Sequence, residues 1–243
     1  MSAPRLVLVH GFTQTGRSFA PLRMRLDGYE MLAPDLPGHG PTPDPATDLW
    51  DAAERLGQAG GKATYLGYSM GGRVALHLAL ARPDLVERLV LIGATAGIED
   101  DDERAARRAA DAVLATELEH DGVDAFLDRW LAQPHFAGLT PEAAGRQARG
   151  ENTASGLADA LRHLGTGNQE PLWGRLLDIA MPVLLVAGER DERFCELAMR
   201  MGAWIGGLAS LAMVPAAGHA CHLERPDAFA DLLRPWLAEG HAH

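Results

Sequence analysis

The segment Gly67-Tyr68-Ser69-Met70-Gly71 has a serine between two glycines in a G-x-S-x-G pattern. It follows a strand-like apolar run and opens a helical pattern. In that context, small flanking residues allow a sharp strand-to-helix turn that projects the serine hydroxyl. The first turn of such a helix has unpaired N–H groups, which favour negative charge developing beside the serine. The pattern therefore predicts a reactive Ser69.

A reactive serine needs a base, and the base needs a carboxylate that orients it. Asp191 closes the strand-like run in "LLVAGERD", and His219 follows the final strand-like run in "VPAAGHACHLERP". We expect Asp191 rather than Glu189 to orient His219, because loops at the ends of the strands face the same edge of the sheet as the serine turn. His222 is expected to be structural, packing or capping the helix that follows.

Two backbone N–H groups are expected to stabilise an oxyanion beside the serine. Met70, directly after the serine, supplies one of them. The other is assigned to Phe12, in the loop "VHGFTQ" after the first strand, where a glycine lets the backbone turn close to the site. His10 in this loop is expected to be a structural turn residue. His39, in the tight "DLPGHG" turn, is given no catalytic role.

Short apolar runs alternate with helical patterns along the chain, which is typical of a parallel sheet with crossover helices. The fold class is therefore predicted to be α/β. Strands are expected at 5–9, 30–34, 63–67, 88–94, 182–188 and 210–215. Helices are expected at 18–27, 46–59, 70–82, 192–203 and 226–238.

The alternation stops between Thr95 and Ala180, where the sequence has helical patterns and no convincing strand. A loop of that length in a compact domain needs structure of its own. We expect a helical cap at 97–180, inserted into a core formed by 1–96 and 181–243. Helices within the cap are expected at 100–119, 122–132, 140–149 and 154–164.

Composition restricts the possible partners of the chain. The formal net charge is −11, which argues against nucleic acid or an anionic membrane surface. No apolar run approaches 18 residues, and the start of the sequence passes directly into a strand-like run, so we expect a cytoplasmic protein that does not insert into a membrane. Cys195 and Cys221 lack a zinc or redox spacing and are expected to be reduced thiols. The chain is expected to be a monomer or a weak homo-oligomer.

Arg73 lies four residues after the serine, one turn into the predicted helix. An enzyme that hydrolyses neutral esters has no need for a guanidinium at this position. A carboxylate-bearing substrate would explain it, because arginine binds carboxylates through two parallel hydrogen bonds. The sequence therefore predicts an anionic small-molecule substrate.

The predicted triad and fold resemble the α/β-hydrolases across essentially the whole chain. Four segments narrow the resemblance: "GYSMGGRVALHLA", "DERAARRAAD", "FLDRWLAQPHFAGL" and "AGERDERF". Together they resemble the 2-succinyl-6-hydroxy-2,4-cyclohexadiene-1-carboxylate synthases, which are lyases of menaquinone biosynthesis. The resemblance implies elimination of pyruvate from 2-succinyl-5-enolpyruvyl-6-hydroxy-3-cyclohexene-1-carboxylate, without a cofactor or a metal ion.

The same resemblance assigns a set of substrate-binding residues. Arginines that hold the substrate carboxylates correspond to Arg73, to Arg107 in the first cap helix with Arg104 nearby, and to Arg149 in "ARGEN". Further positions that line the substrate site in this family correspond to Tyr68, Trp130 and Phe136.

Several of these residues have a structural alternative. Arg104, Arg107 and Arg108 share one helical face, and Glu103 is placed to pair with Arg107, which would suit a solvated surface. Trp130 and Phe136 could pack the cap without contacting a ligand.

Two other functions also fit the sequence. The first is a serine hydrolase of small carboxylic esters or C–C bonds with the same triad. The second is a ligand-binding protein of this fold with little turnover. A dehalogenase is excluded, because that chemistry uses a carboxylate where this chain has Ser69.

Overall fold

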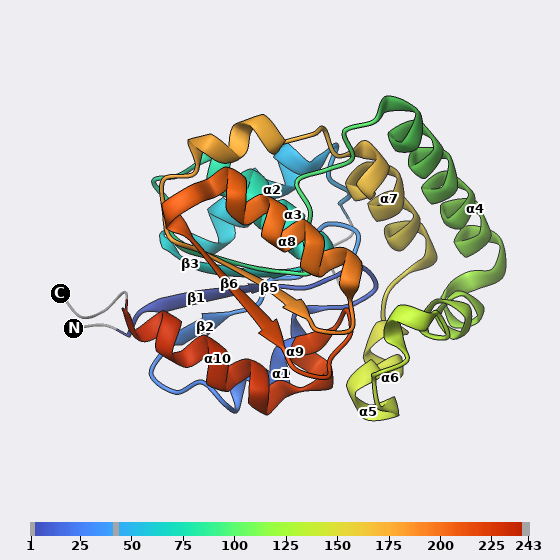
Figure 1. Cartoon of the computed structure of the whole chain (residues 1–243). Coiled ribbons are helices and arrows are strands. Elements are labelled where there is room, and N and C mark those ends of the chain that lie inside the picture. Colours follow the sequence, from blue (N-terminus) through green and yellow to red (C-terminus); the bar gives the residue numbers. More distant parts are fainter. Residues whose placement is uncertain (1–2, 41–43, 240–243) are drawn as a thin grey trace.

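The computed structural model describes residues 3–40 and 44–239. Its centre is a six-stranded sheet with the order β2-β1-β3-β4-β5-β6, and every pair of neighbouring strands is parallel. Helices cover both faces of this sheet (Figure 1). The predicted α/β fold with a parallel sheet is therefore confirmed.

The six strands lie where the apolar runs predicted them, with ends shifted by at most two residues. They are β1 (Arg5–Val9), β2 (Glu30–Leu32), β3 (Ala63–Tyr68), β4 (Val86–Ile92), β5 (Val183–Gly188) and β6 (Ala209–Val214). Every residue of β3 and β5 is buried, as expected for strands with helices on both faces. The edge strands β2 and β6 are shorter or more exposed.

The core helices form two layers. α2 (Leu49–Gly60), α3 (Met70–Ala81) and α8 (Glu192–Ile205) cover one face of the sheet, and α1 (Ala20–Arg23) and α10 (Pro226–Ala238) lie against the other (Figure 1). Two separate apolar clusters fill the two faces. Short helical turns complete the core: η1 (Gly16–Phe19), η5 (Gly206–Leu208) and α9 (Cys221–Glu224).

A helical segment occupies the chain between β4 and β5, at one side of the sheet (Figure 1). Two of the predicted helices are joined in one long element, which is bent at Gly122, where φ is 81°. The elements of this segment are α4 (Asp101–Leu131), η2 (Pro134–Phe136), α5 (Pro141–Ala144), α6 (Arg146–Arg149), α7 (Ala154–Leu164), η3 (Thr166–Asn168) and η4 (Trp173–Asp178).

The helical segment has an apolar centre of its own where α4 packs against α7. Ala115, Leu118 and Phe126 from α4 meet Leu157 and Leu161 from α7. The end of the segment packs differently, because the side chains of η4 belong to the apolar cluster of the sheet. Within the described ranges, no helix is long and apolar enough to cross a membrane.

Candidate active site

Ser69 occupies the sharp turn between β3 and α3. Its φ is 51° and its ψ is −111°, a backbone conformation that residues other than glycine rarely adopt. The flanking glycines make the turn possible: a Cβ on Gly67 would lie 2.4 Å from the carbonyl oxygen of Gly71, and one on Gly71 would lie 2.2 Å from that of Val9. The G-x-S-x-G spacing is therefore a packing requirement of this turn.

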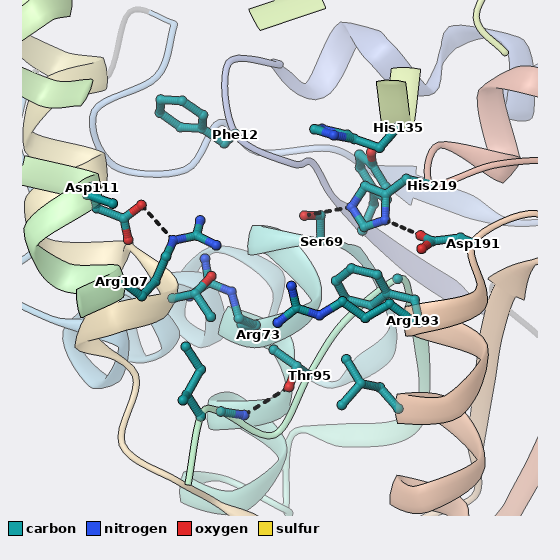
Figure 2. A pocket seen from close by; sticks show the side chains of 18 of the residues that line it. Phe12, Ser69, Arg73, Thr95, Arg107, Asp111, His135, Asp191, Arg193 and His219 are labelled. Carbon is teal, nitrogen blue, oxygen red and sulfur yellow. Dashed lines mark hydrogen bonds and ion pairs between the residues drawn. The ribbon is translucent and has the colours of Figure 1, made fainter. Parts of the chain in front are cut away.

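The structure brings Ser69, His219 and Asp191 together at the carboxyl ends of three strands. His219 Nε2 is 3.3 Å from Ser69 Oγ, and His219 Nδ1 is 2.7 Å from Asp191 Oδ2 (Figure 2). Glu189 points elsewhere, because its carboxylate accepts a hydrogen bond from the Ala216 N–H at 2.9 Å. This geometry allows His219 to take a proton from the serine while Asp191 fixes its ring.

The loop after β1 lies beside Ser69, because β1 and β3 are neighbours in the sheet. The N–H groups of Phe12 and Met70 have no hydrogen-bond acceptor among the residues with described structure, so both are free to bind an oxyanion. His10 and His39 instead hold the loop. Leu36 N–H donates to His10 Nε2 at 2.9 Å, and Thr13 N–H donates to His39 Nε2 at 3.2 Å.

Both loop histidines are buried, and burial lowers the pKa of His10 to about 4 and that of His39 to about 3. They are therefore neutral acceptors at neutral pH, as their backbone contacts require. The structural role expected of His10 is confirmed. His39, for which no catalytic role was expected, has a structural role as well.

A cavity of about 900 Å³ opens over Ser69, between the sheet edge and the helical segment. This volume suits a small organic ligand. The cavity contains the three triad residues and every residue to which the family resemblance assigned substrate binding. These are Tyr68, Arg73, Arg107, Trp130, Phe136 and Arg149.

Arg73 is buried in the wall of this cavity, at 5% relative exposure. Its side chain makes no hydrogen bond or ion pair with the residues that the structure describes, and its Nη1 is fully enclosed without a partner. Burial and the nearby Arg107 lower the pKa of Arg73 to about 10. The side chain is still positively charged at neutral pH, and a buried charge without a partner is energetically unfavourable.

The arginines of α4 do not act as one solvated face. Arg107 reaches the cavity, and its Nε donates to Asp111 Oδ1 at 2.9 Å, so its carboxylate partner is Asp111 and not Glu103. Asp111 is 1% exposed. Arg104 and Arg108 do not line the cavity, and they bind the backbone carbonyls of Ile98 and Gly167 instead.

Arg149 lines the cavity but much of its hydrogen-bonding capacity is used within the protein. Its Nε donates to the Ala144 carbonyl at 2.7 Å, and its Nη1 donates to the Phe12 carbonyl at 3.3 Å and to Thr13 Oγ1. These bonds tie the loop after β1 to the helical segment. Burial lowers the pKa of Arg149 to about 10.

The aromatic residues both pack and line the cavity. Trp130 lies 5.2 Å from Phe12 and 5.9 Å from Phe136 between ring centroids, and its buried Nε1–H has no partner among the described residues. Tyr68 lies beneath His219, with ring centroids 5.4 Å apart. Trp130 and Phe136 therefore pack the helical segment and also line the cavity.

Three side chains near the triad were not predicted from the sequence. His135 stacks edge-on against His219 with ring centroids 5.8 Å apart, and burial, with a smaller effect of His219, lowers its pKa. Arg193 enters the cavity from α8 (Figure 2). Glu224 accepts hydrogen bonds from Gly218 and Ala220 on either side of His219. Arg193 follows Asp191 by two residues, which was the signal available for it.

His222 and the cysteines match their structural assignments. His222 is buried at 1% exposure, with its ring 4.4 Å from that of Tyr68 between centroids, and burial lowers its pKa to about 3. Cys195 and Cys221 are both unpaired thiols.

Comparison with known proteins agrees with this geometry. The sequence model described as "Alpha/beta hydrolase family" matches residues 6–232. The chain is 31% identical to the 2-succinyl-6-hydroxy-2,4-cyclohexadiene-1-carboxylate synthase of Serratia proteamaculans (strain 568), over 96% of this chain and 93% of that protein. It is 34% identical to a Bacillus subtilis (strain 168) protein provisionally named as the same synthase, over 96% and 89% of the two chains.

Among solved structures, MenH from S. aureus matches with a TM-score of 0.90 and 30% identity, over 99% of this chain and 96% of that one. A thermophilic esterase from Thermogutta terrifontis matches with a TM-score of 0.83 at 24% identity, over 99% and 92%, and supports the fold alone.

The parallel sheet, the serine turn after β3 and the histidine after the last strand define the class of protein, and the chain belongs to the alpha/beta hydrolase family. Within that family it belongs with the 2-succinyl-6-hydroxy-2,4-cyclohexadiene-1-carboxylate synthases.

Proposed function

We propose that the protein is a lyase that eliminates pyruvate from 2-succinyl-5-enolpyruvyl-6-hydroxy-3-cyclohexene-1-carboxylate, giving 2-succinyl-6-hydroxy-2,4-cyclohexadiene-1-carboxylate for menaquinone biosynthesis. The synthases to which it is similar are named for this product. The observation that carries the proposal is the buried, unpartnered Arg73 in the cavity next to Ser69. Binding a substrate carboxylate there would neutralise a charge that the protein itself leaves unpaired.

In the proposed mechanism, Ser69 and His219 move one proton. His219 Nε2 takes the Ser69 hydroxyl proton, and the serine oxygen removes the ring proton next to the succinyl ketone. A positioned base of this kind contributes about 10²- to 10⁴-fold in rate. Asp191 orients His219 and stabilises its charged form.

The electron pair of the broken C–H bond first forms a dienolate on the ketone. The N–H groups of Phe12 and Met70 stabilise the negative oxygen, and each such donor is typically worth about 10²- to 10³-fold. The electrons then return through the ring and break the C–O bond to the enolpyruvyl group. The departing enolate takes the proton held by His219 and becomes pyruvate.

The substrate has three carboxylates, and we assign them to the arginines of the cavity. Arg73 and Arg107 hold carboxylates of the ring-bearing part, with Asp111 fixing the Arg107 side chain. Arg149 contacts the substrate with the donors that its backbone contacts leave free. Tyr68, Trp130 and Phe136 pack against the apolar part of the ring.

We infer that 97–180 is a cap on a core formed by 1–96 and 181–243. Packing of α4 against α7 supports the cap, and the packing of η4 in the sheet cluster supports a return of the chain to the core near the end of this segment. We also infer a cytoplasmic protein that is a monomer or a weak homo-oligomer and takes an anionic small molecule as its substrate. Because the net charge is −11, an anionic substrate needs local positive groups, which Arg73, Arg107 and Arg149 would supply.

The test couples the purified protein to enzymatically generated enolpyruvyl substrate and follows pyruvate release, with a small aryl ester assayed in parallel. We expect pyruvate release well above the spontaneous rate and feeble ester cleavage. Ser69→Ala is the control for the spontaneous background. Fast ester cleavage without pyruvate release would establish the serine hydrolase instead.

A further inference from the structure

Arg193 is a cavity residue without a partner in the protein. It lies in the first turn of α8, two residues after Asp191, and its side chain extends into the cavity towards Arg73 from the wall opposite Arg107 (Figure 2). Among residues 3–40 and 44–239, it forms no hydrogen bond or ion pair. All five N–H donors of its guanidinium are therefore available to a ligand.

Arg200, the next cavity arginine on α8, is held by contacts within the protein. Arg200 forms an ion pair with Glu99 at 2.5 Å, and its guanidinium lies 3.9 Å from the ring centroid of Trp173. Arg107 and Arg149 are likewise held by protein acceptors. In the described part of the chain, only Arg73 and Arg193 reach the cavity without such an acceptor.

The two unpartnered arginines differ in depth. Arg73 is buried in the cavity wall, whereas Arg193 is exposed, at the solvent side of the cavity. A carboxylate on Arg73 would be enclosed, and one on Arg193 would remain in contact with solvent. A fragment that is cut from a bound substrate needs a route to solvent, and a site at the exposed Arg193 provides one.

We propose that Arg193 binds the carboxylate of the three-carbon fragment, as the enolpyruvyl group before C–O cleavage and as pyruvate after it. This inference rests on the proposed function. The planar guanidinium accepts a carboxylate through two parallel N–H···O bonds, which fixes the orientation of the fragment. It also places a positive charge near the ether oxygen, which becomes negative as the C–O bond breaks.

The decisive measurement is inhibition by one product, pyruvate, compared with inhibition by an analogue of the other, the ring product. Pyruvate and a 2-acylbenzoate, an aromatic analogue of the ring product, are each titrated against pyruvate-forming activity in the wild type and in Arg193→Gln. Arg190→Gln is the matched control, because Arg190 is an exposed neighbour that does not line the cavity. Binding of pyruvate is measured separately by ligand-observed NMR, without turnover.

We expect Arg193→Gln to raise the inhibition constant of pyruvate by about 10-fold and to leave that of the 2-acylbenzoate within about twofold. Arg190→Gln should change neither constant. Equal weakening of both inhibitors, or an unchanged pyruvate constant, would overturn the assignment. An effect that disappears at high ionic strength would mean that Arg193 only attracts anions from solution.

Failure of the proposed function gives a different result. In that case the wild type releases no pyruvate above the spontaneous rate. The NMR titration then still decides whether Arg193 holds a small carboxylate, since pyruvate binding that is lost in Arg193→Gln does not require catalysis. Absence of pyruvate binding in a wild type that does release pyruvate would overturn the assignment of Arg193 and leave the proposed function standing.

Discussion

Arg73 and Arg107 reach the same cavity from different elements, α3 and α4 (Figure 2), and burial together with the nearby Arg107 lowers the pKa of Arg73. One buried carboxylate, Asp111, pairs with Arg107; it only partly offsets the charge of Arg73 and forms no ion pair with it. Positive charge is therefore concentrated around Arg73 and Arg107, where, among the described residues, only Asp111 lies close enough to offset it. An anionic substrate would remove the repulsion, which is the reason we place the carboxylate-bearing substrate here.

The unpaired charge of Arg73 predicts opposite effects on activity and stability. Arg73→Ala should lower kcat/KM for pyruvate release by about 10- to 150-fold, the cost of losing a charge-assisted contact of about 1.5–3 kcal/mol. Arg73→Met should raise the free energy of unfolding by about 1–3 kcal/mol, because a buried charge is replaced by an apolar chain. Urea unfolding measures the second effect. Arg82→Met is the control, because Arg82 follows α3 outside the cavity and its charge is already paired with Asp84; it should show neither effect. Unchanged kinetics in Arg73→Ala would refute the carboxylate assignment.

The positive φ of Ser69 predicts a second case in which a substitution lowers activity and raises stability. A positive φ at a residue with a Cβ costs about 1–3 kcal/mol, and glycine adopts the same conformation without that cost. Ser69→Gly should therefore abolish lyase activity and raise the free energy of unfolding by about 1 kcal/mol. Ser69→Ala is the matched control, since it also loses the hydroxyl but keeps the strained Cβ. Equal stability of the two variants would show that the turn is not strained.

The hydrogen bonds of Glu224 predict that this carboxylate positions His219. Its carboxylate accepts hydrogen bonds from Gly218 N–H at 2.7 Å and from Ala220 N–H at 3.2 Å, the two peptide groups that flank the histidine. Glu224→Gln replaces one acceptor oxygen with an amide donor, so kcat should fall about 10-fold while KM changes by less than about twofold. Asp227→Asn is the control, because that carboxylate pairs with Arg25 at the surface. A parallel rise in KM would indicate a wider distortion of the cavity instead.

His222 predicts a loss of stability in acid. Burial, above all, lowers its folded-state pKa to about 3, whereas an unfolded histidine titrates near 6.5. Between these two values the unfolded chain binds a proton that the folded chain does not, so the free energy of unfolding falls as the pH falls. At pH 5 the titration of His222 should lower the free energy of unfolding by about 2 kcal/mol.

His222→Phe should therefore lose about 2 kcal/mol less than the wild type between pH 7.5 and pH 5 in urea unfolding. The exposed His120 provides the control variant His120→Gln, which should follow the wild type. The remaining acid sensitivity belongs in part to His10 and His39, which are also buried and neutral. An identical pH dependence in His222→Phe and the wild type would contradict the prediction.

The sequence by itself determined the strands of the sheet and the order of the triad residues along the chain. Apolar runs and helical periodicity placed all six strands, because a parallel sheet covered on both faces needs continuous apolar strands. The strand-to-helix turn at Ser69 and the strand ends before Asp191 and His219 were predictable for the same reason: carboxyl ends of parallel strands meet at one edge of the sheet.

Only the tertiary structure decided which arginines have partners. Spacing put Arg104, Arg107 and Arg108 on one helical face, but it could not show that Asp111 pairs with Arg107, or that Arg149 ties the loop after β1 to the helical segment. The spacing of Arg193 from Asp191 placed it near the triad, but it could not show that the side chain enters the cavity without a partner. The charge state and reach of a side chain depend on distances across the fold, and the sequence does not contain those distances.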